Sequence, residues 1–319
     1  MACPTLDELP PPPSGKTGWP WTEQSDPLPD TQPDGAPWPK ISIVTPSYNQ
    51  GQFIEETLRS ILLQGYPNLE YIVMDGGSTD GSAAIIQKYE PWLTYWTSAP
   101  DDGQSDAINR GFERATGRIY NWVNSDDFLR PRALHTVGTL FALPENIQWL
   151  TGARIARSDQ TGTEEVHVPW RSQWPQYLLD RPDFPQEATF FSADAWDAVG
   201  GLDEELQNVM DVLFYHQMLR YTKRGAFTSA PLSGMNVHME QKTKANDDRL
   251  RREMRRVKQD YFTHHPFQRL VQRALQTRWH KQVWNLWRTV SAQTAARTFL
   301  IARHDYERSE WSLAPFYAR

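Results

Sequence analysis

The stretch Arg118-Ile119-Tyr120-Asn121-Trp122-Val123-Asn124-Ser125-Asp126-Asp127 carries a short hydrophobic strand directly into a polar Asn-x-Asp-Asp cluster. Three strand–helix units precede it, and each of their strands ends in polar or acidic residues. In an alternating β/α chain the carboxyl ends of the strands share one edge of the sheet, so these groups are expected to converge there. Carboxylates beside oxygen-bearing side chains suit a hard divalent cation, which usually accompanies a phosphate-bearing substrate.

Apolar strands and amphipathic helices alternate ahead of that stretch. Strands are expected at 41–47, 69–74, 95–97 and 119–123, with helices between them, the last over 105–115. Strands joined by helices of this length pair in parallel through right-handed crossovers. The expected fold class is therefore α/β, with a Rossmann-like, mostly parallel sheet flanked by helices.

The pattern changes after Asp127. A β-hairpin is predicted at 149–157 and 164–170, a short strand at 188–192, and a helix from Asp211 to about Thr222. From Asp247 onward the chain looks helical. The expected domains are a proline-rich arm over 1–39, which its tryptophans could pin to the body, an α/β domain over 40–245, and a basic, Trp-rich helical extension over 246–319.

Charge is distributed unevenly along the 319 residues. The net charge is −6, but residues 1–243 carry 17 Lys and Arg against 32 Asp and Glu, and residues 244–319 carry 16 against 7. A basic, Trp-bearing extension on an acidic body favours a membrane surface or another anionic partner, although a solvated helical face explains it equally well. We expect no nucleic-acid partner.

A single cysteine, Cys3, excludes an intramolecular disulfide and a cysteine-based zinc site. No stretch reaches the roughly 18 apolar residues that a bilayer-spanning helix needs, and the acidic, proline-rich N-terminus is unlike a signal peptide. We therefore expect a protein of a reducing compartment, cytoplasmic or peripheral at the inner face of the membrane.

Four motifs stand in order along the chain: Ile43-Val44-Thr45-Pro46-Ser47-Tyr48-Asn49, Asp75-Gly76-Gly77-Ser78-Thr79-Asp80-Gly81-Ser82, Gly103-Gln104-Ser105-Asp106-Ala107-Ile108-Asn109-Arg110-Gly111 and Asn124-Ser125-Asp126-Asp127. Together they resemble family 2 glycosyltransferases, which are inverting, nucleotide-sugar-dependent enzymes with the GT-A fold. One motif alone is a weak signal, but the ordered set is specific. The resemblance covers roughly residues 40–245 and leaves out the arm and the extension.

The resemblance implies a nucleotide pocket formed along the four motifs. It places a uracil ring against Asp75, whose carboxylate can accept a hydrogen bond from a ring N–H. The other residues that it implies in nucleotide binding are Thr45, Pro46, Ser47, Gly103, Gln104, Asp106, Asn124 and Ser125. On the residues alone, Asp75 also fits a turn, and Asp106 fits an acidic residue favoured at a helix N-terminus.

Asn124-Ser125-Asp126 occupies the position of the family's Asp-x-Asp motif, with an uncharged amide in place of the first carboxylate. The resemblance makes Asp126 the main ligand of Mn²⁺ or Mg²⁺, an ion that would neutralise charge on the leaving diphosphate. It favours His238 as a further metal ligand or a diphosphate contact, although a lone histidine is more often structural. Lys242 is expected to complement the phosphates. Asp127 is expected to contact the sugar or to hold Asp126.

Inversion requires a base on the far face of the sugar. In the family this base is an acidic residue at the N-terminus of a helix, and Asp211 matches it, with Met210 in place of a common glutamate. Its carboxylate would take the proton of the acceptor hydroxyl, and a plain helix N-cap is the alternative. Gln186 and Glu187 fall in a segment that resembles the acceptor side.

The expected function is metal-dependent, inverting transfer of a sugar from a nucleotide donor, with UDP preferred, to a hydroxyl of a glycan or a lipid-linked acceptor. A nucleotidyltransferase would need basic residues where the chain has Asn49-Gln50-Gly51-Gln52. A non-catalytic module that binds sugar nucleotide or glycan is compatible with Asn124, but Asp126 and Asp211 argue against it. The sequence does not name the sugar, the acceptor or the oligomeric state.

Overall fold

The computed structural model describes residues 3–158, 161–169, 184–222, 224–238, 247–264, 299–305 and 310–315. Their strands are β1 (Ile41–Ser47), β2 (Leu69–Asp75), β3 (Tyr95–Ser98), β4 (Ile119–Trp122), β5 (Asp127–Leu129), β6 (Trp149–Ser158), β7 (Glu164–His167), β8 (Thr189–Ser192), β9 (Gly225–Val237), β10 (Phe299–Asp305) and β11 (Glu310–Pro315). Their α-helices are α1 (Ile54–Leu62), α2 (Ser82–Tyr89), α3 (Gln104–Phe112), α4 (Ala133–Ala142), α6 (Ala193–Val199), α7 (Met210–Tyr221) and α9 (Asp247–His264), and short 3₁₀ turns cover Leu6–Glu8, Glu90–Trp92 and Gln186–Ala188.

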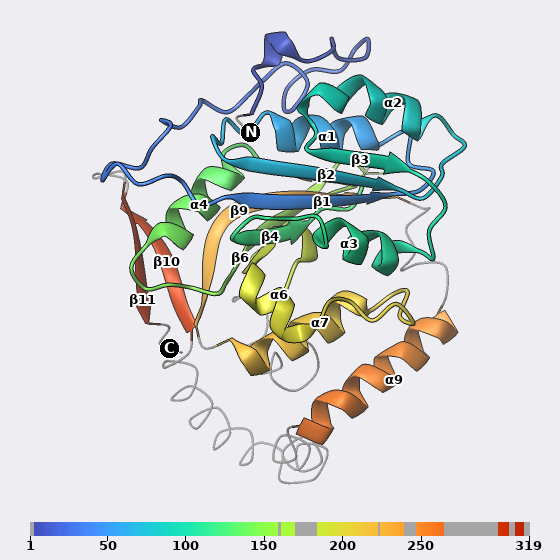
Figure 1. Cartoon of the computed structure of the whole chain (residues 1–319), viewed down its shortest axis with the longest axis vertical. Coiled ribbons are helices and arrows are strands. Elements are labelled where there is room, and N and C mark those ends of the chain that lie inside the picture. The colour runs from blue at the N-terminus through green and yellow to red at the C-terminus, as the bar shows by residue number, and fades with distance from the viewer. Residues whose placement is uncertain are drawn as a thin grey trace.

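The described strands form one sheet in the order β11-β10-β9-β6-β8-β4-β1-β2-β3, with β5 paired to β9 and β7 to β6 (Figure 1). The half of the sheet made of β1 to β4 follows the prediction. Strand β1 pairs in parallel with β2 and β4, and β2 pairs in parallel with β3. The other half combines parallel pairs, β6 with β9 and β9 with β10, with antiparallel ones. Strand β8 runs antiparallel between β4 and β6, so the sheet is mixed beyond β4.

Helices cover both faces of this sheet and form two apolar cores. Helices α1, α2 and α4 pack on one face, and α3, α6 and α7 pack on the other (Figure 1). The approach of α3 is close, since a Cβ atom added to Gly111 would lie 2.5 Å from a methyl carbon of Val44 on β1. Successive side chains of each strand enter opposite cores, which explains why β1 and β2 are buried on both faces.

The expected helical extension is corrected at its end. Helix α9 begins at Asp247 as predicted, but residues 299–305 and 310–315 form an antiparallel pair whose first strand joins the sheet beside β9. This pairing depends on backbone contacts with β9, a strand that is distant in sequence. The local apolar periodicity that predicted a helix carries no information on such contacts. The part of the expected extension over 265–298 lies outside the described residues. No helix in the described part of the chain is both long and apolar enough to cross a membrane.

Candidate active site

The strand ends converge as the alternation predicts. In the parallel register, Ser47 at the end of β1 lies opposite Asp75 at the end of β2, and Asp75 lies opposite Ser98 at the end of β3. Strand β4 lies on the other side of β1 and leads into Asn124-Ser125-Asp126. The motifs that lie more than 70 residues apart in sequence therefore share one edge of the sheet.

Asp75 lies almost fully buried at this edge. One carboxylate oxygen accepts from the Ser78 hydroxyl at 2.6 Å, and the other accepts from the Ser78 N–H at 2.9 Å and the Ser98 hydroxyl at 2.6 Å. A second carboxylate, Asp101, lies close by, because a Cβ atom added to Gly76 would come within 2.8 Å of it. Burial, together with the charges of Asp106 and Asp75, raises the pKa of the Asp101 carboxyl above its ordinary value. Sequence reasoning missed Asp101, whose only signal was its place just after β3.

The three residues predicted around the nucleoside differ in access. Thr45 is fully buried, and its hydroxyl pairs with that of Tyr71 at 3.0 Å, so its side chain faces the core beneath the pocket. Pro46 is buried as well, and the buried hydroxyl of Ser47 has no hydrogen-bond partner among the described residues. The next residue, Tyr48, is 64% exposed. It exposes an aromatic ring directly after the end of β1, and the sequence analysis gave this residue no role of its own.

Asn124 joins three predicted residues in one network. Its carbonyl oxygen accepts from the Gln104 amide at 2.7 Å, and its own amide donates to Gln186 at 3.2 Å and to the Asp127 carboxylate at 3.4 Å. The Gln186 amide in turn donates to the Trp122 carbonyl oxygen. A carboxylate at position 124 could accept from Gln104 but could not donate to Asp127. The amide is therefore the residue that this network requires.

Asp126 and His238 form the candidate metal centre. The Asp126 carboxylate lies 3.1 Å from Nε2 of His238, whose ring packs on Phe53 with centroids 4.5 Å apart. Nδ1 of the buried His238 ring has no partner among the described residues. A carboxylate oxygen beside an imidazole nitrogen is a donor set that fits Mn²⁺, and Mg²⁺ favours the oxygen alone. The described residues hold no cluster of three or more ligand-type side chains.

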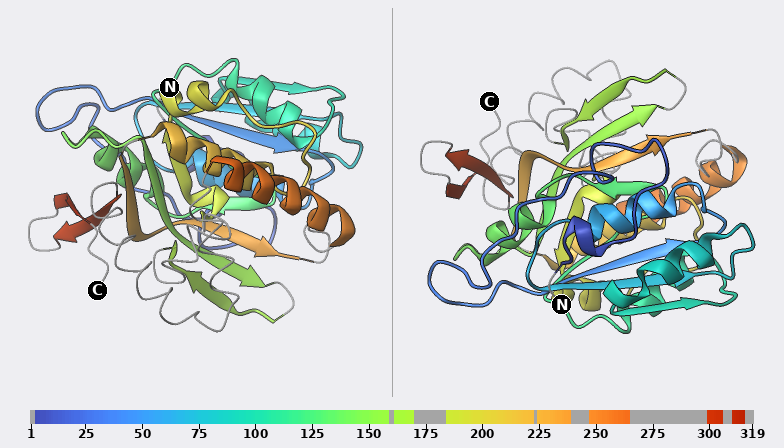
Figure 2. Two further views of the ribbon diagram at one scale, coloured as in Figure 1. Left: turned by 90° about the horizontal axis from the view of Figure 1, so that it is seen from below. Right: turned by 90° about the horizontal axis from the view of Figure 1, so that it is seen from above.

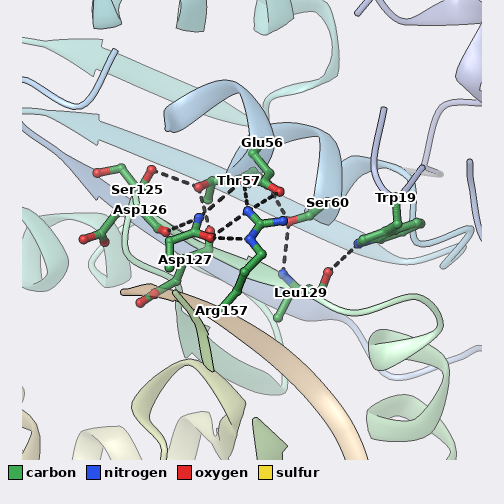
Figure 3. Close-up of polar contacts among 10 residues, drawn as sticks. Trp19, Glu56, Thr57, Ser60, Ser125, Asp126, Asp127, Leu129 and Arg157 are labelled. Atoms are coloured by element: carbon green, nitrogen blue, oxygen red, sulfur yellow. Dashed lines mark hydrogen bonds and ion pairs between the residues drawn. The ribbon is translucent and has the colours of Figure 1, made fainter. Parts of the chain in front are cut away.

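Helix α1 and strands β6 and β9 support the backbone around Asp126 (Figure 3). The Thr57 hydroxyl donates to the carbonyl oxygens of Ser125 and Asp127 at 2.9 and 2.6 Å. The Asn236 amide donates to the Asp126 carbonyl oxygen at 2.9 Å, and Asn236 is held in turn by the Arg157 guanidinium. Ser125 is buried in this arrangement and is fixed through its backbone.

A charged cluster lies next to Asn124. Asp127 and Glu187 are 5% and 3% exposed, and the Arg154 guanidinium lies 3.7 Å from the Glu187 carboxylate. Burial above all, then the charges of Asp126 and Glu187, raise the pKa of the Asp127 carboxyl well above its ordinary value, although Arg154 opposes them. Arg154 lies in the middle of β6, where nothing in the sequence marks it as a site residue.

Asp211 lies in the first turn of α7, four residues before Tyr215. After burial, the charges of Asp211 and Glu187 raise the pKa of the Tyr215 phenol, so both carboxylates lie near that side chain. The Tyr215 hydroxyl donates to the Gln186 carbonyl oxygen at 3.4 Å. These contacts connect the α7 helix to the Asn124 network.

The remaining predicted residues are less closely connected to the site. Gly103 has φ +113°, which glycine adopts readily, and its Cα lies beside the side chain of Gln207. The Asp106 carboxylate accepts from the Asp102 N–H at 3.1 Å and pairs with Arg110 at 3.2 Å on its own helix. Lys242 lies outside the described residues.

Comparisons with known proteins agree with this geometry. Residues 42–195 match the family model described as Glycosyl transferase family 2. An uncharacterised glycosyltransferase of Mycobacterium tuberculosis is 30% identical over 167 residues, which cover 52% of this chain and 63% of that protein. Chondroitin synthase of Escherichia coli is 26% identical over 196 residues, which cover 59% of this chain and 27% of the synthase. The chain thus spans less than two thirds of the length of these relatives.

The fold has solved counterparts. The crystal structure of S. aureus TarS in complex with UDP-GlcNAc matches with a TM-score of 0.55 at 19% identity, and the match covers 65% of this chain and 61% of that one. At this identity the likeness concerns the fold alone, a curled mixed sheet flanked by helices. The family match over residues 42–195, the glycosyltransferase relatives and the fold together support a family 2 glycosyltransferase with a GT-A fold.

Proposed function

We propose that this protein transfers a sugar from a UDP-linked donor to a hydroxyl group of a glycan or lipid-linked acceptor, with inversion at the anomeric carbon. One observation carries the proposal. The hydrogen bonds from Gln104 through Asn124 to Gln186, and from Tyr215 to Gln186, link the Asp126 turn with the helix that bears Asp211. One polar network thereby joins the turn that carries the proposed metal ligand Asp126 to the helix that carries the proposed base Asp211.

Each residue has a proposed role in this reaction. Asp75 would accept a hydrogen bond from the base ring, and the exposed ring of Tyr48 would cover the base. Asp211 would take the proton of the acceptor hydroxyl as that oxygen attacks the anomeric carbon and the nucleoside diphosphate leaves with the bonding electrons. Asp127 and Glu187, whose charges the nearby Arg154 guanidinium offsets, would contact the sugar hydroxyls or the acceptor.

Asp126 and His238 would hold Mn²⁺ or Mg²⁺, and the ion, when bound, supplies positive charge beside the diphosphate. Support for UDP comes from the TarS crystals, which contained UDP-GlcNAc and UDP. Support for a glycan acceptor comes from the similarity to chondroitin synthase. A peripheral site at a membrane surface is compatible with the arginine-rich α9 helix.

The test combines a donor screen with one substitution. We expect release of nucleotide from one member of a panel of nucleotide sugars with Mn²⁺, and a loss of at least about a hundredfold in turnover for Asp211→Asn. UDP affinity should stay within about twofold of wild type. Asp194→Asn, which alters an exposed carboxylate in the first turn of α6, is the matched control and should leave turnover intact. Undiminished turnover in Asp211→Asn would rule out this residue as the base.

A further inference from the structure

A buried carboxylate on α9 contacts the loop that leads into the Asp211 helix. Glu253 is 7% exposed and accepts from the Asn208 N–H at 2.8 Å and the Gln207 N–H at 3.2 Å. It also accepts from the Asn208 side-chain amide at 3.3 Å and from Arg249 on its own helix at 2.8 Å. One side chain of α9 thus satisfies two consecutive backbone donors just before α7.

Helix α7 has no side-chain cap at its N-terminus. Its N-cap residue is Val209, whose side chain cannot accept a hydrogen bond. A negative charge near a helix N-terminus is favourable, because that end carries partial positive charge. Glu253 does not bond the first turn of α7 itself; it places a carboxylate beside that end of the helix by accepting from the two backbone N–H groups just before Val209.

Apolar packing seats α9 on the same element. Val257 is fully buried, and Leu250 and Met254 pack against the core cluster that includes Val209 and Met210. Figure 2 shows α9 running alongside α7. Arg256 adds contacts with Asp203 and Glu205, but these are exposed pairs, which contribute little. Arg220 of α7 also pairs with Asp260 of α9 in a part-buried contact, and Glu253 is the buried carboxylate that reaches the loop before α7.

The opposite side of the loop contacts the nucleotide-side helix. The Ser105 hydroxyl donates to the Leu206 carbonyl oxygen at 3.3 Å, and the Gln207 side chain lies against Gly103. The loop over 206–209 is therefore held between α3, which carries Gln104, and α9. A shift of this loop would move α7 and the Asp211 carboxylate with it.

We propose that Glu253 is a positioning residue for catalysis: by holding the 206–209 loop, it sets the place of the Asp211 carboxylate relative to the acceptor hydroxyl. This inference rests on the proposed function. It also makes α9, which lies beyond the residues that match the family model, part of the catalytic body. The alternative is that Glu253 contributes only to stability.

The test is a comparison of Glu253→Ala and Glu253→Gln with wild type. Because misplacing a reacting group by about 1 Å can cost up to a hundredfold, we expect kcat to fall roughly tenfold to a hundredfold in Glu253→Ala. The donor KM and the UDP affinity should stay within about twofold. Glu253→Gln keeps one acceptor oxygen and should recover much of kcat. Arg252→Ala, an exposed change on the same helix, should match wild type.

Hydrogen exchange at residues 206–212 provides a readout that does not need activity. It should become faster in Glu253→Ala, with exchange in β1 and β2 unchanged. A wild-type kcat in the folded alanine variant, or equal losses in kcat and UDP affinity, would overturn the inference. If the wild-type chain transferred no sugar, the proposed function would be wrong. In that case, unchanged hydrogen exchange at residues 206–212 in Glu253→Ala would separately show that Glu253 does not hold the loop.

Discussion

At the scale of single residues, the amide of Asn124 is the most informative departure from the family's motif. Its side chain accepts from Gln104 and donates to Gln186 and Asp127, so both ends of the amide are used. Motif logic predicts that Asn124→Asp would restore a metal ligand. The structure predicts that the new carboxylate would face two acceptors, one of them the buried Asp127.

We therefore expect Asn124→Asp to be destabilising. Leaving Gln186 and Asp127 without their donor should reduce the free energy of unfolding at pH 7 by about 1–3 kcal/mol, as measured by urea denaturation. Asn146→Asp, which changes an asparagine of the α4–β6 connection, is the control. A variant as stable as wild type, with increased affinity for Mn²⁺, would favour the motif logic over the network.

At the scale of elements, one carboxylate joins two strands and a turn. Glu70 on β2 accepts from the Ser42 hydroxyl on β1 and from the N–H and hydroxyl of Thr116, at 2.7 and 2.8 Å. Burial alone would raise its pKa, but these bonds, with Lys40 nearby, outweigh burial and hold the pKa of the Glu70 carboxyl below its ordinary value of 4.5. This contact ties the start of β4 to the β1–β2 pair.

The pH dependence of this contact follows from the sign of that shift. A depressed pKa gives stability that is present above the ordinary value and is lost as the pH falls through the lower, folded-state value. Glu70→Ala should therefore cost about 1–3 kcal/mol of unfolding free energy at pH 7. The difference from wild type should shrink below pH 4.5. Exposed Glu113→Ala is the control, and a pH-independent difference would contradict the assignment.

Elements also mark the limit of what the sequence could predict. Local periodicity was enough for β1 to β4, the helices between them and the start of α7, because each burial pattern lies within one segment. It could not predict that β8 returns antiparallel beside β4, since that direction depends on distant packing. The family resemblance predicted Asn124, Gln186 and Asp211 as site residues. Arg154 and Glu253 carry no motif, and only the packing of β6 and α9 brings them to the site.

At the scale of the whole molecule, the N-terminal arm is held by a buried cation. Arg59 of α1 is fully buried and donates to the carbonyl oxygens of Pro10, Pro20 and Trp21, at 2.7 to 3.1 Å. Trp19 donates to the Leu129 carbonyl oxygen at 2.8 Å, two residues after Asp127 (Figure 3). The arm therefore supplies three carbonyl acceptors to this buried charge, which also donates to the Tyr89 hydroxyl, and it contacts the strand behind the site.

The single cysteine can report whether the arm is docked. Cys3 packs against the apolar core, and burial raises the pKa of its thiol to about 11 from an ordinary value of 9.0. Because the thiolate is the reactive form, Cys3 of the folded protein should react slowly with a disulfide reagent at pH 8.

Arg59→Met removes the donors that the three arm carbonyls need, so the arm should detach more often. Labelling should then accelerate, up to roughly a hundredfold if the thiol regains its ordinary pKa. Arg252→Met on exposed α9 should label at the wild-type rate, and equal rates in all three proteins would show that Arg59 does not hold the arm.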